Sequence, residues 1–107
     1  MVFNEKLTYQ SSEKYLDGVK LNVQNEYLVP SYGTGLVLFI GEKENYGNTV
    51  IVSLNDGIDI WYSNVNPSVK LYDYIKEGEL IGTSLSNYIY VVFKKDGAIL
   101  NYEEYLH

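Results

Sequence analysis

The chain has 107 residues, eight Lys and Arg, fourteen Asp and Glu, and a formal net charge of −6. This length corresponds to one domain with a modest core, and the acidic balance disfavours nucleic acid and direct contact with anionic lipid, because both require a Lys/Arg surface. The absence of cysteine excludes disulfides and thiolate chemistry, and the longest apolar run, 36–40, is far shorter than the ~20 residues of a membrane span.

The first half of the chain contains three strand signals. A strand is expected at 6–10. In 18–23 the side chains of Val19, Leu21 and Val23 alternate with polar ones, which is typical of a half-buried strand. The run 36–40 is continuously apolar and ends at Gly41, which indicates a buried strand.

The middle of the chain contains a hairpin signal. The β-branched segment 49–54 ends at the turn Asn55-Asp56-Gly57, and 58–62 then resumes with Ile58, Ile60 and Tyr62 on one face. These two segments should pair antiparallel.

The C-terminal part repeats this pattern. After a break at 66–68 and a brief strand at 80–82, the strand 88–93 leads into a second hairpin turn at 95–97. Residues 101–106 are expected to form one helical turn with Asn101 as its cap. Strands about ten residues apart with turns between them predict an all-β barrel or sandwich.

The chain has twelve tyrosines, far above ordinary usage. Tyrosine favours pleated sheet surfaces and half-buried core positions. It also supplies large, stiff contact area at protein interfaces. Both interpretations remain open from the sequence.

Five segments of the chain occur in the order of five motifs of one enzyme family. They are Leu16-Asp17-Gly18-Val19-Lys20, Tyr46-Gly47-Asn48-Thr49-Val50, Tyr62-Ser63-Asn64-Val65, Ile75-Lys76-Glu77-Gly78-Glu79-Leu80-Ile81-Gly82 and Tyr88-Ile89-Tyr90-Val91-Val92. The ordered set resembles the LytM/lysostaphin zinc peptidases, which cut peptide cross-bridges in bacterial cell walls. The resemblance implies the LytM-type peptidase fold, a duplicated hybrid motif with a barrel-sandwich-like antiparallel sheet, over residues 14–107 after an irregular lead-in at 1–13.

The resemblance also places the family's zinc ligands and catalytic histidines on Leu16, Lys20, Asn64, Tyr88 and Tyr90. Zinc sites use His, Cys, Asp or Glu. Leucine has no donor atom, the lysine ammonium repels a cation, the tyrosine phenol has a pKa of ~10, and an asparagine amide is no general base near neutral pH. The chain's one histidine, His107, is its last residue. We therefore expect a catalytically inactive domain that binds no metal and no cofactor.

The two tyrosines at 88 and 90 keep the spacing of a His-x-His strand, with two side chains about 7 Å apart on one face. They either fill the volume of a lost site or grip a peptide or protein. Tyr62, Asn64, Tyr88 and Tyr90 are the expected partner-binding residues.

Within the family, the run 71–78 most resembles the stage IV sporulation protein FA family. Members of that family are membrane-anchored regulators that restrain an intramembrane protease. The resemblance implies the outer domain of such a regulator, outside the cytoplasm, tethered through a segment not in this chain, with a membrane-embedded protease complex as its protein partner.

Two alternatives come from other classes. The first is a module that binds cell-wall peptide, or a peptidase with an unrecognised site. The second is an adaptor with a biotinyl/lipoyl-like barrel, since Gly-x-x-Ile-Gly also occurs there. A carrier of that type displays a lysine beside methionine at a hairpin tip, and Lys95 lacks that setting because the only methionine is Met1.

Overall fold

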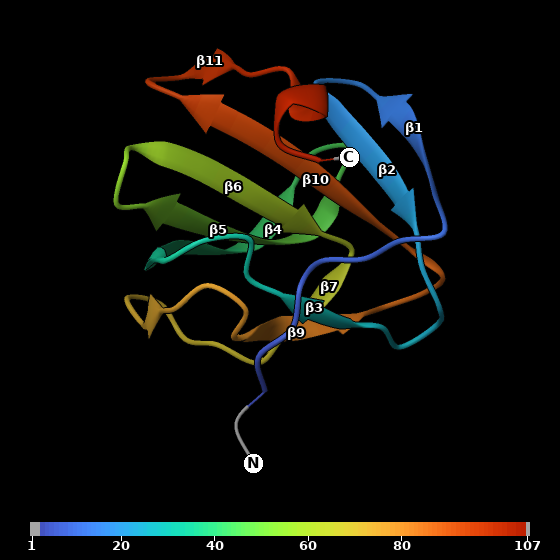
Figure 1. Ribbon diagram of the computed structural model, residues 1–107, viewed down its shortest axis with the longest axis horizontal. Helices are drawn as coiled ribbons and strands as arrows, with labels where there is room; N and C mark the ends of the chain where they lie inside the picture. Colours follow the sequence, from blue (N-terminus) through green and yellow to red (C-terminus); the bar gives the residue numbers. More distant parts are fainter. Residues whose placement is uncertain (1–2, 107) are drawn as a thin grey trace.

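Two antiparallel sheets make up the computed structural model, which describes residues 3–106 (Figure 1). The elements are β1 (Ser11–Tyr15), β2 (Gly18–Asn22), β3 (Leu28–Pro30), β4 (Gly35–Lys43), β5 (Gly47–Leu54), β6 (Ile58–Ser63), β7 (Val65–Pro67), β8 (Tyr74–Ile75), β9 (Leu80–Ser84), β10 (Tyr88–Lys95), β11 (Ala98–Ile99) and one 3-10 turn (Tyr102–Glu104). The prediction of an all-β fold is confirmed. No helix long and apolar enough to cross a membrane is found in residues 3–106.

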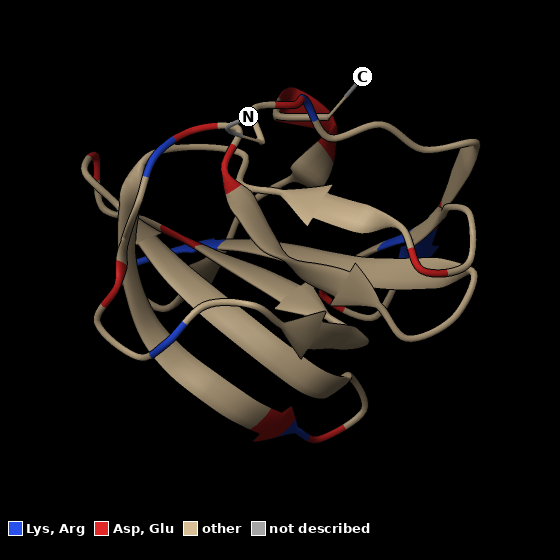
Figure 2. Cartoon of the chain, turned by 90° about the horizontal axis from the view of Figure 1, so that it is seen from below, with Lys and Arg blue, Asp and Glu red and all other residues tan. Residues whose placement is uncertain are grey.

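The large sheet has the strand order β1-β2-β10-β6-β5-β4-β8, with β11 paired to β10. Strand β10 lies in its middle, between β2 and β6, although it is close to the end of the chain (Figure 1). The small sheet has the order β3-β9-β7. Charged residues lie mainly in turns and at strand ends (Figure 2).

Both predicted hairpins are present. Thr49 pairs with Ser63 and Ser53 with Asp59 across β5 and β6, and Lys95 pairs with Ala98 across β10 and β11. The second turn has positive φ at Asp96 and Gly97, 52° and 80°, the backbone of a two-residue hairpin turn.

The predicted strand at 6–10 is wrong, and the first strand begins at Ser11. The lead-in bonds to loops instead: the Glu5 amide donates to the Gly78 carbonyl at 3.0 Å, and the Thr8 amide donates to the Tyr27 hydroxyl at 2.9 Å. The expected boundary after residue 13 falls inside β1. The C-terminal turn forms as a short 3-10 turn, and the Asn101 side chain accepts from the Glu103 amide at 3.1 Å, as predicted for its cap.

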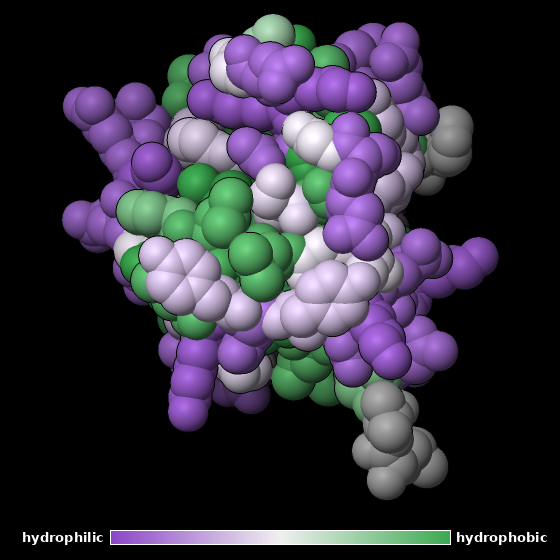
Figure 3. Space-filling model, turned by 90° about the vertical axis from the view of Figure 1, so that its left-hand side faces the viewer, coloured by the Kyte–Doolittle hydropathy of each residue, from purple (hydrophilic) through white to green (hydrophobic). Residues whose placement is uncertain are grey.

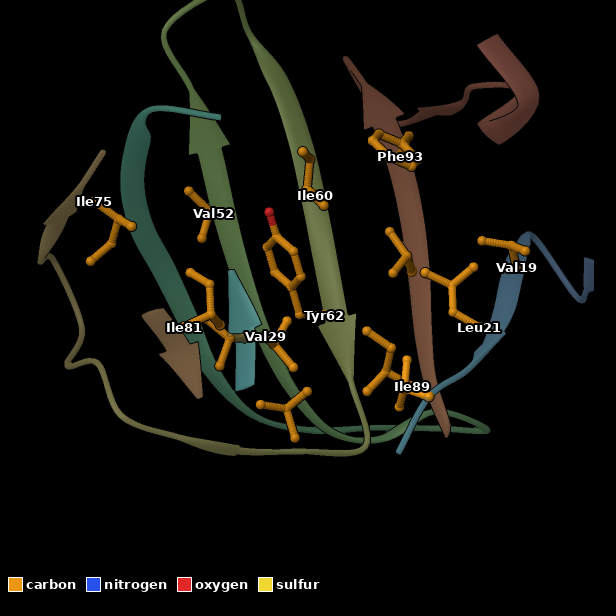
Figure 4. Packing of buried hydrophobic residues seen from close by; sticks show 14 of the residues in the cluster. Val19, Leu21, Val29, Val52, Ile60, Tyr62, Ile75, Ile81, Ile89 and Phe93 are labelled. Atoms are coloured by element: carbon orange, nitrogen blue, oxygen red, sulfur yellow. The ribbon is translucent and has the colours of Figure 1, made fainter. Parts of the chain in front are cut away.

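The core lies between the two sheets (Figure 4). The large sheet contributes Leu21, Ile60 and Ile89, and the small sheet contributes Val29 and Ile81, all fully buried. Burial of an aliphatic side chain of this size contributes about 1.5–3 kcal/mol. The alternation of the strands places every second residue of β2, β6 and β10 on the outer face of the large sheet, and that face carries the expected site residues.

Candidate functional site

Four of the five expected site residues lie together on the outer face of the large sheet. The rings of Tyr88 and Tyr90 have centroids 5.2 Å apart, and the Nζ of Lys20 lies 4.6 Å from the centroid of the Tyr88 ring. The Nδ2 of Asn64 donates to the Tyr88 carbonyl at 2.9 Å and to the Oγ of Ser86 at 2.9 Å. β10 brings them together because it pairs with β2 on one side and with β6, which ends just before Asn64, on the other.

Leu16 lies beside this group rather than in it. It occupies the β1–β2 turn with a φ of 49° and is 53% exposed. It lines a neighbouring hollow with Asp17, Tyr46 and Trp61. Tyr46 also lines the hollow that Asn64, Tyr88 and Tyr90 line.

Three aromatic residues complete the site, and none was expected there. The ring of Tyr15 stacks on that of Tyr90, with centroids 4.1 Å apart. The buried ring of Tyr46 meets those of Tyr15, Tyr90 and Trp61 edge-on, at 5.6, 5.8 and 5.8 Å. We call Tyr15, Tyr46, Trp61, Tyr88 and Tyr90 the aromatic cluster. Such ring geometries are favourable beyond the burial of area.

Hydrogen bonds hold two rings of the aromatic cluster in place. The hydroxyl of Tyr15 donates to the Asn45 carbonyl at 2.6 Å, and the Asp17 amide donates to the hydroxyl of Tyr46 at 3.2 Å. The segment 42–47, Asn64, Tyr88 and Tyr90 enclose an open hollow of about 600 Å³ above these rings.

The phenols of Tyr46 and Tyr90 stay protonated near neutral pH. Burial raises the pKa of Tyr90 far above its ordinary value, and the adjacent Tyr15 and Tyr88 hydroxyls raise it further. Burial also raises the pKa of Tyr46, where the neighbouring Asp17 carboxylate acts in the same direction. Desolvation disfavours the charged phenolate.

Lysines lie over the exposed faces of the rings. The Nζ of Lys94 is 4.4 Å and that of Lys43 is 5.1 Å from the Trp61 ring centroid. Lys20 also approaches the Glu13 carboxylate at 3.7 Å. Each of these ammonium groups is in the range of a cation–π contact. The surface around the cluster therefore combines aromatic rings and lysines with the carboxylates of Glu42 and Glu44, which line the hollow.

The expectation that Tyr62 contributes to a partner-binding surface is wrong. Its exposed fraction is 0%, and its ring points into the core between the sheets (Figure 4). Its hydroxyl accepts a hydrogen bond from the Tyr32 amide at 2.9 Å, and burial raises its pKa to about 12. The reason is the alternation of β6, which turns Trp61 rather than Tyr62 toward the outer face.

The family follows from comparison with known proteins. The model of peptidase family M23 matches residues 14–105. The chain belongs to peptidase family M23. No curated protein matches it. The M23 membership replaces the biotinyl/lipoyl-like barrel considered from the sequence.

Solved structures of this family share the fold. Csd3 from Helicobacter pylori has a TM-score of 0.80 at 22% identity over 99% of this chain and 33% of its own. The catalytic domain of lysostaphin from Staphylococcus simulans has a TM-score of 0.76 at 20% identity over 99% of this chain and 89% of its own. A structure of the SpoIIQ–SpoIIIAH pore-forming complex has a TM-score of 0.73 at 23% identity, over 92% of this chain and 69% of the matched chain. These likenesses confirm the LytM-type fold.

This M23 chain spans only part of several of these proteins. It covers 36% of a lysostaphin solution structure and 33% of Csd3.

The side chains that the resemblance places at the zinc site do not fit the zinc ion of an M23 peptidase. Leu16 has no donor atom, the ammonium of Lys20 lies against the Tyr88 ring, and the raised pKa of Tyr90 keeps its phenol protonated. The stacked ring of Tyr15 covers one face of Tyr90. Within residues 3–106, no group of three or more His, Cys, Asp or Glu could hold a metal, and His107 lies outside the described residues.

Proposed function

We propose that this chain is a catalytically inactive M23 domain whose function is protein recognition. The observation that carries the proposal is the aromatic cluster, which contains Tyr88 and Tyr90, two of the residues that the resemblance places at the family's zinc site. A hydrolytic zinc needs three protein ligands and a water. In this chain the Tyr15 ring stacks on Tyr90, and the Lys20 ammonium lies against the Tyr88 ring.

The chemistry of the hollow supports a protein partner. Tyrosine and tryptophan are enriched at the centres of protein interfaces, and Asn64, Tyr88 and Tyr90 remain accessible at the rim. The structural neighbour SpoIIQ, of the same fold, takes part in a complex with a second protein. Asn64, Tyr88 and Tyr90 are thus the proposed contact residues of this surface.

The proposed setting follows from the resemblance to the stage IV sporulation protein FA family. In this setting the chain is the outer domain of a membrane-anchored sporulation regulator, outside the cytoplasm, and its partner is a membrane-embedded protease complex. The resembling run 71–78 forms β8 and the segments beside it, and Leu71, Tyr72 and Tyr74 are exposed there.

Metal analysis and a cleavage assay test the inactivity. The purified protein should retain no stoichiometric zinc after dialysis and should cleave neither glycine-rich nor cell-wall peptides, while the lysostaphin catalytic domain cleaves the former in parallel. About one zinc retained per chain would end the proposal.

A sedimentation assay separates protein recognition from the cell-wall alternative. The protein should stay in the supernatant when insoluble peptidoglycan is pelleted. If it pellets, and Tyr88→Ala releases it, the hollow binds cell-wall material instead. One observation favours that alternative: the hollow lined by Asn64, Tyr88 and Tyr90 is open to solvent.

A further inference from the structure

One edge of the large sheet is largely unpaired. β4 is nine residues long, yet β8 covers only Gly35 and Leu36 on its outer side. Val37 adds two bonds there, donating to the Asp73 carbonyl at 2.9 Å and accepting from the Tyr72 amide at 2.8 Å. Among residues 3–106, no strand pairs with the outer side of 38–43.

Apolar side chains gather beside this edge. We define the β4 patch as Leu36, Leu38, Leu71, Tyr72 and Tyr74. They are five of the nine large hydrophobic residues that are exposed within residues 3–106, with exposed fractions of 37–68%. The pairing of Leu36 with Tyr74 and the irregularity between Val37 and Phe39 bring them together. Figure 3 shows apolar side chains flanked by rings on the side of the molecule where β4 and β8 lie.

Residues 38–41 of this edge lack the charge and the proline that commonly protect an edge strand, and the irregularity between Val37 and Phe39 lies at their start. Proteins block exposed edges with charges, proline or covering segments, and an apolar edge left open is a template for another chain. The residues 36–41 contain neither charge nor proline. Charge begins only at Glu42, the second-last residue of β4.

The charges at this end of β4 indicate what binds there. Glu42 and Glu44 are exposed, and neither lies within ion-pair distance of a lysine in the part of the chain that the structure describes. Lys43, between them, is turned onto the Phe39 and Trp61 rings. The red, blue and red tip of one strand in Figure 2 corresponds to this segment. A positively charged residue of a partner would complement the carboxylates of Glu42 and Glu44. A second copy of this chain, with a net charge of −6, would be repelled.

We propose that an extended segment of a different protein adds to the large sheet as a strand antiparallel to the free half of β4. The segment has apolar side chains at alternate positions, the C-terminal ones reaching Leu38 and the adjoining end of the β4 patch, and a Lys or Arg near its N-terminal end, beside Glu42. Backbone bonds to β4 supply affinity, and the alternate side chains supply specificity. The proposal rests on the protein-recognition function proposed above, but it uses the edge of β4, which meets the hollow of the aromatic cluster at Glu42.

Synthetic octapeptides test the strand addition directly. The probes begin with Lys and alternate Val, Ile, Leu, Phe or Tyr with Thr, and their binding is measured by fluorescence anisotropy. The best binder is then N-methylated in two sets, at odd or at even positions. Only one set of backbone amides in a strand faces its neighbour, so we expect one methylated set to abolish binding and the other to retain it.

Two variants locate the site. Leu38→Lys places a charge on the patch and should weaken binding by about tenfold or more, the loss that accompanies removal of an interface anchor. The matched control is Leu28→Lys, on β3, because Leu28 is similarly exposed. Amide exchange within 38–43 should slow when the peptide binds.

Each contrary outcome has a distinct meaning. Binding that survives both methylated sets, or that Leu38→Lys does not weaken, overturns strand addition at β4. A dimer in analytical ultracentrifugation that Leu38→Lys dissociates assigns the edge to a second copy instead. If no octapeptide binds, the β4 proposal fails, and recognition through the aromatic cluster is judged separately by whether Tyr88→Ala weakens binding to any peptide.

Discussion

Replacing Tyr90 by alanine measures how much the aromatic cluster stabilises the fold. The Tyr90 ring contacts those of Tyr15, Tyr88 and Tyr46, at centroid distances of 4.1, 5.2 and 5.8 Å. Each such pair contributes about 0.5–1.5 kcal/mol beyond burial of area. Because the pairs share one ring and are not additive, we expect Tyr90→Ala to lower the free energy of unfolding by about 2–4 kcal/mol.

Two comparisons calibrate this value. The Tyr88 ring has one ring pair and one contact with Lys20, so Tyr88→Ala should cost about 1–2 kcal/mol. Tyr74 is 57% exposed and belongs to no ring pair among residues 3–106, so Tyr74→Ala should cost less than about 1 kcal/mol.

Urea unfolding followed by far-UV circular dichroism gives all three values, and thermal unfolding gives a second reading. For a domain of this size, 1 kcal/mol shifts the midpoint by roughly 4–8 °C. If Tyr90→Ala costs no more than Tyr74→Ala, the stacked rings do not stabilise the fold, and the reasoning about a filled zinc position is refuted.

Three further predictions concern the core and the sheet. Tyr62→Phe should lower the free energy of unfolding, measured in urea, by about 1–3 kcal/mol, because it leaves the Tyr32 amide without its hydrogen-bond acceptor. An unchanged free energy of unfolding would show that this hydrogen bond does not stabilise the fold. The raised pKa of Tyr62 means that the folded state keeps a proton that the unfolded state loses. Stability should therefore be complete below pH 10 and fall between about pH 10 and 12, and the fall should be smaller in Tyr62→Phe; an equal fall would assign it to other groups. Gly35→Ala should lower the free energy of unfolding by about 1–3 kcal/mol, because an added Cβ would clash with the backbone carbonyl oxygen of Ser53. Gly41→Ala is the control, since its Cβ would meet only the Phe39 ring, which can move. The thermal midpoint of Gly35→Ala should therefore lie clearly below that of Gly41→Ala.

Local patterns predicted much of the sheet. The alternation of 18–23 and the turns at 55–57 and 95–97 each depend on neighbouring residues, so β2 and both hairpins could be predicted. β1 could not, because its residues are mostly exposed and polar, and its place depends on pairing with β2.

The site was predicted only in part. The positions of Tyr88 and Tyr90 on one face followed from strand alternation. The same alternation placed Tyr62 on the core face of its strand, beside Ile60. That pattern contradicted the assignment of Tyr62 to a partner-binding surface. The contacts of Tyr15 and Tyr46 with Tyr90 join three distant segments, and no local pattern encodes them.

The position of β10 has a consequence for how the chain folds. β2 pairs with β10 across a long stretch of chain, Val19 with Val91 at a separation of 72 residues and Leu21 with Ile89 at 68. In contrast, β4, β5 and β6 pair with their neighbours in sequence. Pairings between distant segments form slowly, because a long loop must close first. We therefore expect the meander of β4, β5 and β6 to form early during synthesis and the β1–β2 hairpin to dock last, only after residue 95 has left the ribosome.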